Sequence, residues 1–288
     1  MSMSGTDAFP TADPRPRVAP PRAGAPLRRA DRALVLAGTA WCGLAVAGQL
    51  LFAAYVLGFY GRSAATGQLQ AWNKVMPHGY VPGNSIGNAA VALHLACAAI
   101  VMLGGGLQLV PALRRAAPAA HRWIGRTYIL AATATAIDGV GMVWLRGTVG
   151  DLSQHLAITL NAALILLFGG LAWQRAHTRR FAEHRRWALR LYLAAAGVWF
   201  FRIGLMAWLV LNRGPVGFDP KTFAGPTLTV LAFAQYLLPL AVLEAWLRVR
   251  DGGSVGARFA LSATFVALTL LTALGIFAAA KIFWLPHM

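Results

Sequence analysis

Seven long apolar runs constrain the fold of this 288-residue chain more than any other feature. Each run is long enough to cross the hydrocarbon core of a bilayer, which takes about 20 predominantly apolar residues. Because backbone amides cannot stay unpaired in lipid, each run is expected to form a helix. The runs cover residues 34–59, 87–112, 123–146, 152–173, 187–211, 226–247 and 259–284.

Composition agrees with a membrane protein and excludes several other classes. Hydrophobic residues make up 58% of the chain and charged residues only 12%, whereas a soluble domain is about 25% charged. Cys42 and Cys97 both lie within apolar runs, which excludes a disulfide framework. The net charge of +17 does not predict nucleic acid as a partner, because the basic residues punctuate apolar runs instead of lining a soluble face. The expected partner is the lipid bilayer.

The distribution of basic residues predicts the orientation. Nineteen of them precede the first run or follow the second, fourth and sixth runs, and six lie in the opposite set of segments. The positive-inside rule therefore places the N-terminus in the cytoplasm and the C-terminus outside the inner membrane. Residues 1–32, rich in Pro, Ala and Arg, are expected to form a disordered basic tail. Residues 33–288 are expected to form one transmembrane domain of seven helices.

The chain contains an internal repeat. A shift of 64 residues aligns the second and third runs with the fourth and fifth, so the repeats are 87–150 and 151–214. Because each copy contains two spans, both copies cross the membrane in the same orientation. This predicts a parallel repeat with a site at the interface between the copies. The expected fold is all-α, with seven transmembrane helices around a four-helix core made by runs two to five. No run is visibly interrupted at matching positions of the two copies. Matched residues include Arg122/Arg186, Trp123/Trp187, Arg126/Arg190 and Tyr128/Tyr192.

Four polar side chains from four different runs are expected at similar depth near the outer surface. Asp138 and Arg202 occupy equivalent positions of the repeat, and His94 and His155 lie in the second and fourth runs. Ionisable groups inside a span are costly and usually face the bundle interior. One interpretation is structural, with Asp138 as counter-ion of Arg202 and each histidine bonded to a carbonyl. The other is a pocket for a cofactor or a solute.

A second pair of histidines lies at the cytoplasmic ends of the runs. His121 occurs in HRWIGRTY and His184 in HRRWALRLY. Arginines surround each histidine and a tryptophan follows it, as in an anchor at the lipid headgroups. The alternative interpretation is that the two imidazoles bind a cofactor.

The residues carry two resemblances. The stretch from about 87 to 211, with LHLACAAIVMLGGGLQL, PAAHRWIGRTYIL and EHRRWALRLYLAAAGVWFFR, resembles an uncharacterised family of predicted bacterial multi-pass membrane proteins. More distantly, one histidine in each of runs two to five is similar to the pattern of ascorbate-reducible transmembrane b-type cytochromes. That resemblance implies two haem b groups, one held by His94 with His155 and one by His121 with His184. Asp138 and Arg202 are not part of that pattern, but if haem is bound, Asp138 is expected to hold a ring N–H and Arg202 to neutralise a propionate. A quinone or another redox partner would then exchange electrons with the haems.

Three classes of function therefore stay open at this point. The first is a b-type haem electron carrier. The second is a small-solute or proton-coupled transporter that uses the pocket of His94, His155, Asp138 and Arg202, and the third is a non-catalytic membrane scaffold. A metal site of two histidines and one carboxylate is a lesser alternative. The residues contain no phosphate loop, nucleophile elbow or HExxH motif, and they leave the oligomeric state open.

Overall fold

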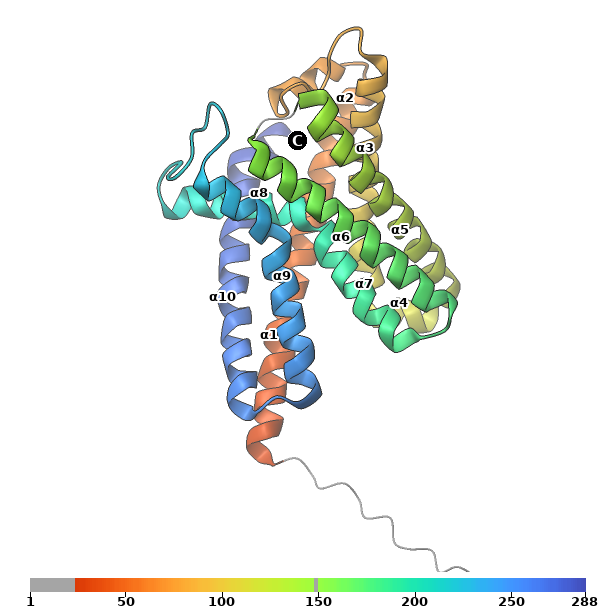
Figure 1. Cartoon of the computed structure of the whole chain (residues 1–288), viewed down its shortest axis with the longest axis vertical. Coiled ribbons are helices and arrows are strands. Elements are labelled where there is room, and N and C mark those ends of the chain that lie inside the picture. Colours follow the sequence, from red (N-terminus) through yellow and green to blue (C-terminus); the bar gives the residue numbers. More distant parts are fainter. Residues whose placement is uncertain (1–23, 148–149) are drawn as a thin grey trace, which may run out of the picture.

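The computed structural model describes residues 24–147 and 150–288, and these residues form helices and loops without a β-strand. The longer helices are α1 (Ala25–Tyr55), α3 (Ser85–Gln108), α5 (Pro118–Gly141), α6 (Leu152–His177), α7 (Phe181–Ala195), α8 (Gly197–Leu211), α9 (Pro226–Gly252) and α10 (Val255–Ala279). Figure 1 shows that α1, α9 and α10 follow the long axis, that α3, α5, α6 and α7 are inclined to it, and that α8 lies across it. Shorter elements are η1 (Val56–Gly61), α2 (Arg62–Ala65), η2 (Leu69–Lys74), α4 (Pro111–Ala116), η3 (Met142–Gly147), η4 (Ala280–Trp284) and η5 (Leu285–His287).

The described chain begins and ends at opposite ends of the molecule (Figure 1). We term the end that holds the start of α1 and the α9–α10 turn the N-side, and the end that holds the α8–α9 loop and the last residue the C-side. In the described residues, six helices are long and apolar enough to cross a membrane, and α7 with α8 forms a seventh candidate that is bent by 49°. An odd number of crossings fits termini at opposite ends, so the seven spans expected from the sequence correspond to these helices.

The helices fall into two groups. Helices α3, α5, α6 and α7 pack in sequence order, and Tyr192 of α7 closes the set by lying against Gly105 of α3. A Cβ at Gly105 would stand only 2.9 Å from the Tyr192 ring, so the absence of a side chain lets the two helices approach. This is the expected four-helix core. The second group is α1, α9 and α10, on which α8 packs through its contacts with α10 and α9.

The fifth span is bent, although its sequence contains no proline. The break lies at Ala196, between α7 and α8. The amide of buried Asn161 lies at the bend, where a Cβ at Gly197 would be 2.9 Å from its Nδ2. In the first repeat copy, α5 runs through the corresponding positions without interruption. The two copies therefore differ in backbone path, and α8 is carried out of the four-helix core.

The first helix begins earlier than the sequence suggested. α1 starts at Ala25 with Pro26 in its first turn, a position that proline favours because no helical N–H partner is lost there. Asp31 forms an ion pair with Arg258 of α10, which fixes this first part of α1 against the bundle. The expectation of a disordered segment is thus wrong for residues 25–32, which are helical. Residues 1–23 of that tail lie outside the described residues.

The repeat reappears in side-chain stacking. Arg126 lies over the ring of Trp123 at 5.0 Å, and its repeat equivalent Arg190 lies over Trp187 at 4.6 Å. A guanidinium over an indole face is held by the ring quadrupole. Equivalent residues therefore make equivalent contacts in both copies.

Candidate functional site

The strongest polar contact inside the four-helix core joins His94 of α3 to Asp138 of α5. Their Nδ1 and Oδ2 atoms lie 3.1 Å apart, and the two side chains are 24% and 17% exposed. At 1.5 Å per residue, His94 lies about 14 Å along α3 from its C-side end, which is well inside the span. An imidazole N–H at this distance donates a hydrogen bond to the carboxylate. The pair is the one carboxylate–imidazole ion pair in the described residues.

Small neighbours make room for this pair. The His94 ring passes over Gly139, where a Cβ would lie 3.6 Å from the ring Cε1. The buried thiol of Cys97 lies one turn along α3 and interacts electrostatically with Asp138. Thr135 donates its hydroxyl to the carbonyl of Ala131 on α5 and so does not compete for the carboxylate. No described hydrogen bond uses Nε2, the second imidazole nitrogen of His94, so this atom is available to another partner.

Arg202 is not the partner of Asp138, which corrects the pairing suggested by the repeat. In the described residues no carboxylate lies within ion-pair distance of Arg202. Its guanidinium instead lies over the ring of Phe52 at 5.4 Å and donates to the carbonyl of Val198. The physical reason is the bend at Ala196, since it turns α8 away from α5 and toward α10 and α9.

His155 lies at the start of α6 and packs against Trp144 in η3, the segment that follows α5. Its ring meets Trp144 edge-on, with 5.5 Å between the centroids. The indole of Trp144 in turn donates to the hydroxyl of Thr159, one helical turn along α6. The Nε2 atom of His155 is buried without a hydrogen-bond partner. No hydrogen bond, ion pair or ring contact in the described ranges joins His155 to His94.

A metal site of two histidines and a carboxylate is not formed. Within residues 24–147 and 150–288, no group of three or more His, Cys, Asp or Glu side chains converges. The His94–Asp138 pair stands at α3 and α5, whereas His155 packs on Trp144 beyond it. The described residues therefore do not bring these three side chains together.

The N-side histidines come closer together. His121 of α5 and His184 of α7 lie within electrostatic range of each other. His184 Nδ1 is 2.9 Å from the carbonyl oxygen of Ala172. A carbonyl can only accept, so Nδ1 carries the proton and the Nε2 atom of the neutral ring keeps its lone pair. His121 presents a buried Nδ1 without a partner, and its backbone carbonyl accepts a hydrogen bond from Gln108.

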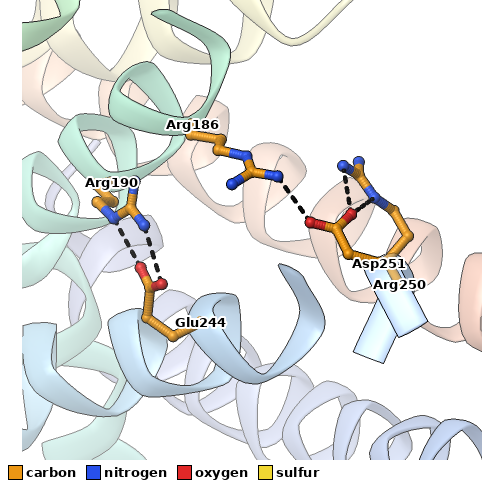
Figure 2. Close-up of polar contacts among 5 residues, drawn as sticks. All are labelled: Arg186, Arg190, Glu244, Arg250 and Asp251. Carbon is orange, nitrogen blue, oxygen red and sulfur yellow. Dashed lines mark hydrogen bonds and ion pairs between the residues drawn. The ribbon is translucent and has the colours of Figure 1, made fainter. Parts of the chain in front are cut away.

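A set of ion pairs at the N-side was missed by the sequence reasoning. Figure 2 shows Arg190 of α7 in a two-pronged contact with Glu244 of α9, at 2.7 and 2.9 Å. One turn closer to the N-side, Arg186 meets Asp251 at 2.7 Å (Figure 2). Arg250 also contacts Asp251. The spacings of four residues on α7 and seven on α9 place each set on one helix face, which is the signal that could have predicted them.

A loop covers the C-side end of α3 and is fixed by one arginine. Arg146, at the end of η3, donates from Nε and Nη2 to the carbonyl of His78 and from Nη2 to the side chain of Asn88. Trp72 in the same loop is buried and donates to the carbonyl of Tyr60. The loop is therefore tied to η1, to α3 and to η3.

These features define an all-α, multi-pass integral membrane protein with ionisable groups inside its spans. The chain belongs to the family described as predicted membrane protein (DUF2306), whose model matches residues 91–247. That match runs from within α3 through most of α9 and includes His94, Asp138 and Arg202. The comparisons with curated proteins and with solved structures gave no match.

Proposed function

We propose that this protein is a proton-coupled membrane carrier in which His94 and Asp138 bind and release the coupled proton. The observation that supports this function is the 3.1 Å contact between the imidazole and the carboxylate of two spanning helices. Ionisable residues in spans are costly and typically mark ion pathways and proton relays. Histidine is the side chain whose ordinary pKa brings its charge change nearest to physiological pH.

The pair can change its charge at low electrostatic cost. With one shared proton it is neutral overall, either as imidazolium with carboxylate or as imidazole with carboxylic acid. A second proton gives it a charge of +1, and both side chains remain partly exposed. Each cycle of proton uptake and release therefore moves one charge, which couples the site to the membrane potential.

The bent fifth span favours a carrier over an inert bundle. In many carriers the substrate site is formed by discontinuous helices near the repeat interface. Here the break between α7 and α8 is 49° and lies in one repeat copy only. The two repeat copies therefore differ: the first contains His94 and Asp138, and the second contains the bent span that carries Arg202.

The test is proton movement in liposomes that contain the purified full chain. A potassium gradient with valinomycin drives proton uptake, which a trapped pH-sensitive dye reports. We expect Asp138→Asn to reduce the rate more than tenfold, because the amide cannot exchange the proton. Asp151→Asn is the matched control, since Asp151 is an N-cap outside the span and asparagine can accept the same cap hydrogen bond. Equal rates in the two variants would contradict the proposal.

A second readout does not depend on knowing the carried solute. Infrared difference spectra between acid and alkaline samples report the C=O band of a protonated carboxyl group. A band that disappears in Asp138→Asn and persists in Asp151→Asn identifies Asp138 as a titrating group of the pair. No change in that band in either variant would remove the carboxylate from the proposed proton path.

A second candidate function is electron transfer through haem b, and the observation that favours it concerns the N-side histidines. His121 and His184 lie within electrostatic range, and the Ala172 carbonyl leaves Nε2 of His184 free to bind iron. A backbone carbonyl that holds the far ring nitrogen is the usual support of a metal-binding histidine. Of the two histidine pairs, the N-side pair is the one for which the described residues give an interaction between the imidazoles. When bound, a haem supplies one-electron chemistry, and a quinone is the class of partner expected.

Absorbance separates the two candidates. Protein from haem-replete cells would show a Soret band at about 410–430 nm that shifts on dithionite reduction, as expected for bis-imidazole haem. His184→Ala would lose that band and His155→Ala would keep it. Colourless protein excludes haem. Unchanged proton movement in Asp138→Asn together with colourless protein would leave a non-catalytic membrane scaffold.

A further inference from the structure

Arg202 lies in a setting that a structural arginine seldom occupies. A guanidinium in a membrane span stays charged and normally has a carboxylate partner. In the described residues Arg202 has none, and only one of its N–H groups donates, to Val198 at 3.3 Å. The residue is exposed, and no described hydrogen bond uses its remaining donors. The contact with Phe52 satisfies one face of the guanidinium plane and none of these donors.

Two tyrosine hydroxyls add to these donors. Tyr55 at the end of α1 and Tyr60 in η1 both interact electrostatically with Arg202 and lie close to each other. Tyr55 is 2% exposed, and its hydroxyl oxygen is buried without a hydrogen bond of acceptable geometry. Its neighbour is the Tyr60 hydroxyl. A buried hydroxyl without a well-formed hydrogen bond costs free energy, so its retention beside an arginine that has no carboxylate partner calls for an explanation.

The rings around this group are rigidly packed. Tyr55 stacks on Phe59 at 5.9 Å, and Tyr60 meets Trp72 edge-on at 6.0 Å. Trp284 of η4 stacks on Tyr55 from the other side. Aromatic side chains locked in this way hold their hydroxyls in place before any ligand arrives, which lowers the entropy cost of binding.

We propose that Arg202, Tyr55 and Tyr60 form a binding site for a phosphate group. The guanidinium offers a planar fork of donors, and the two hydroxyls offer one donor each. A phosphate group has enough acceptor oxygens for all of them, and its pairing with a guanidinium is frequently bidentate. A phospholipid headgroup and a soluble phosphate share this chemistry. The site is separate from the His94–Asp138 pair and does not require that pair to carry protons.

The experiment uses the full chain purified in dodecyl maltoside, a detergent without phosphate. One arm adds phosphatidylglycerol and counts bound lipid by native mass spectrometry. The other titrates inorganic phosphate by calorimetry. The variants are Arg202→Gln and Tyr55→Phe. Arg213→Gln serves as matched control, because Arg213 is an exposed arginine just beyond the same helix.

We expect Arg202→Gln to weaken binding at least about tenfold and Tyr55→Phe by about three- to tenfold, while the control binds like the wild type. Loss in the lipid arm alone identifies a headgroup as the source, and loss in the calorimetric arm alone identifies a soluble phosphate. Tyr55→Phe removes one oxygen atom from a packed ring, so it keeps the test valid if Arg202→Gln does not fold. Asp138→Asn should retain phosphate binding even where it abolishes proton movement. Wild-type protein that binds neither probe, or variants that bind like the control, would overturn the proposal.

Discussion

The two buried tyrosines of the repeat provide an internal comparison of hydrogen-bond energy. Tyr192 donates its hydroxyl to Oε1 of Gln49 at 3.0 Å, and Gln49 is 1% exposed. Its repeat equivalent Tyr128 has a buried hydroxyl without a partner. Phenylalanine at either position removes the same atom from a similarly buried ring. The two substitutions therefore differ in one respect, the presence of a hydrogen bond.

The expected magnitudes follow from what each change leaves behind. Tyr192→Phe leaves Oε1 of Gln49 unpaired, and Nε2 of Gln49 already lacks a partner. Leaving a buried polar atom unpaired costs about 1–3 kcal/mol, and hydrogen bonds between spans reach at most about 1.7 kcal/mol. We therefore expect Tyr192→Phe to lower the free energy of unfolding by about 1–2 kcal/mol. Tyr128→Phe should change it by less than about 0.5 kcal/mol, or raise it, because an unpaired hydroxyl is removed.

Reversible unfolding in sodium dodecyl sulfate, followed by tryptophan fluorescence, measures both values. Gln49→Leu completes a double-mutant cycle with Tyr192→Phe. Because the apolar pair leaves no unpaired group, the double variant should be more stable than the sum of the single losses predicts. A larger loss for Tyr128→Phe than for Tyr192→Phe, or strictly additive losses in the cycle, would refute this reasoning.

Three further predictions concern packing, capping and an interhelical ion pair. A Cβ at Gly48 would lie 2.4 Å from a neighbouring side-chain carbon, whereas Gly43 on the same helix has nothing within 4 Å. Thermal unfolding should therefore show a loss of about 1–3 kcal/mol for Gly48→Ala and no loss for Gly43→Ala. Hydrogen bonds from Ser153 and from the backbone of Gln154 hold the pKa of the Asp151 carboxyl below its ordinary value. The ionised carboxylate therefore adds to the free energy of unfolding above the ordinary pKa, and this addition is lost as pH falls through the lowered pKa. When stability is measured against falling pH, the wild type should come down to the level of Asp151→Asn. Asp31→Asn should lower the free energy of unfolding by about 1–3 kcal/mol in the same assay, because Arg258 is 8% exposed and loses its counter-ion. A loss no larger than that caused by replacing an exposed aspartate with asparagine elsewhere would contradict this prediction.

The sequence was sufficient for the parts of the fold that depend on apolar length and on local register. The all-α membrane architecture and the family are confirmed, and the stacked Trp123–Arg126 and Trp187–Arg190 pairs agree with the repeat. These features follow from runs of side chains along one helix, which a sequence displays directly.

The pairing of polar groups was not predictable in the same way. Register gave Asp138 and Arg202 equivalent places in their own helices, but a partner depends on where the neighbouring helix goes. The bend at Ala196 has the side chain of Asn161 packed beside Gly197, and a lone glycine in an apolar run gives no sign of it. His94 therefore became the partner of Asp138 by packing of α3 on α5, which no spacing in the sequence encodes.

The loss of symmetry between the repeat copies goes together with the packing of α9. This helix packs on α6, α7 and α8, which together form the second copy, and its ion pairs fix α7 through Arg190. The equivalent Arg126 of the first copy is exposed, and Trp123 beside it is 67% exposed. Because α9 packs on the second copy, equivalent residues of the two copies have different surroundings. One copy can then bend at its glycine and present an arginine to α1, while the other stays straight and keeps a carboxylate facing an imidazole.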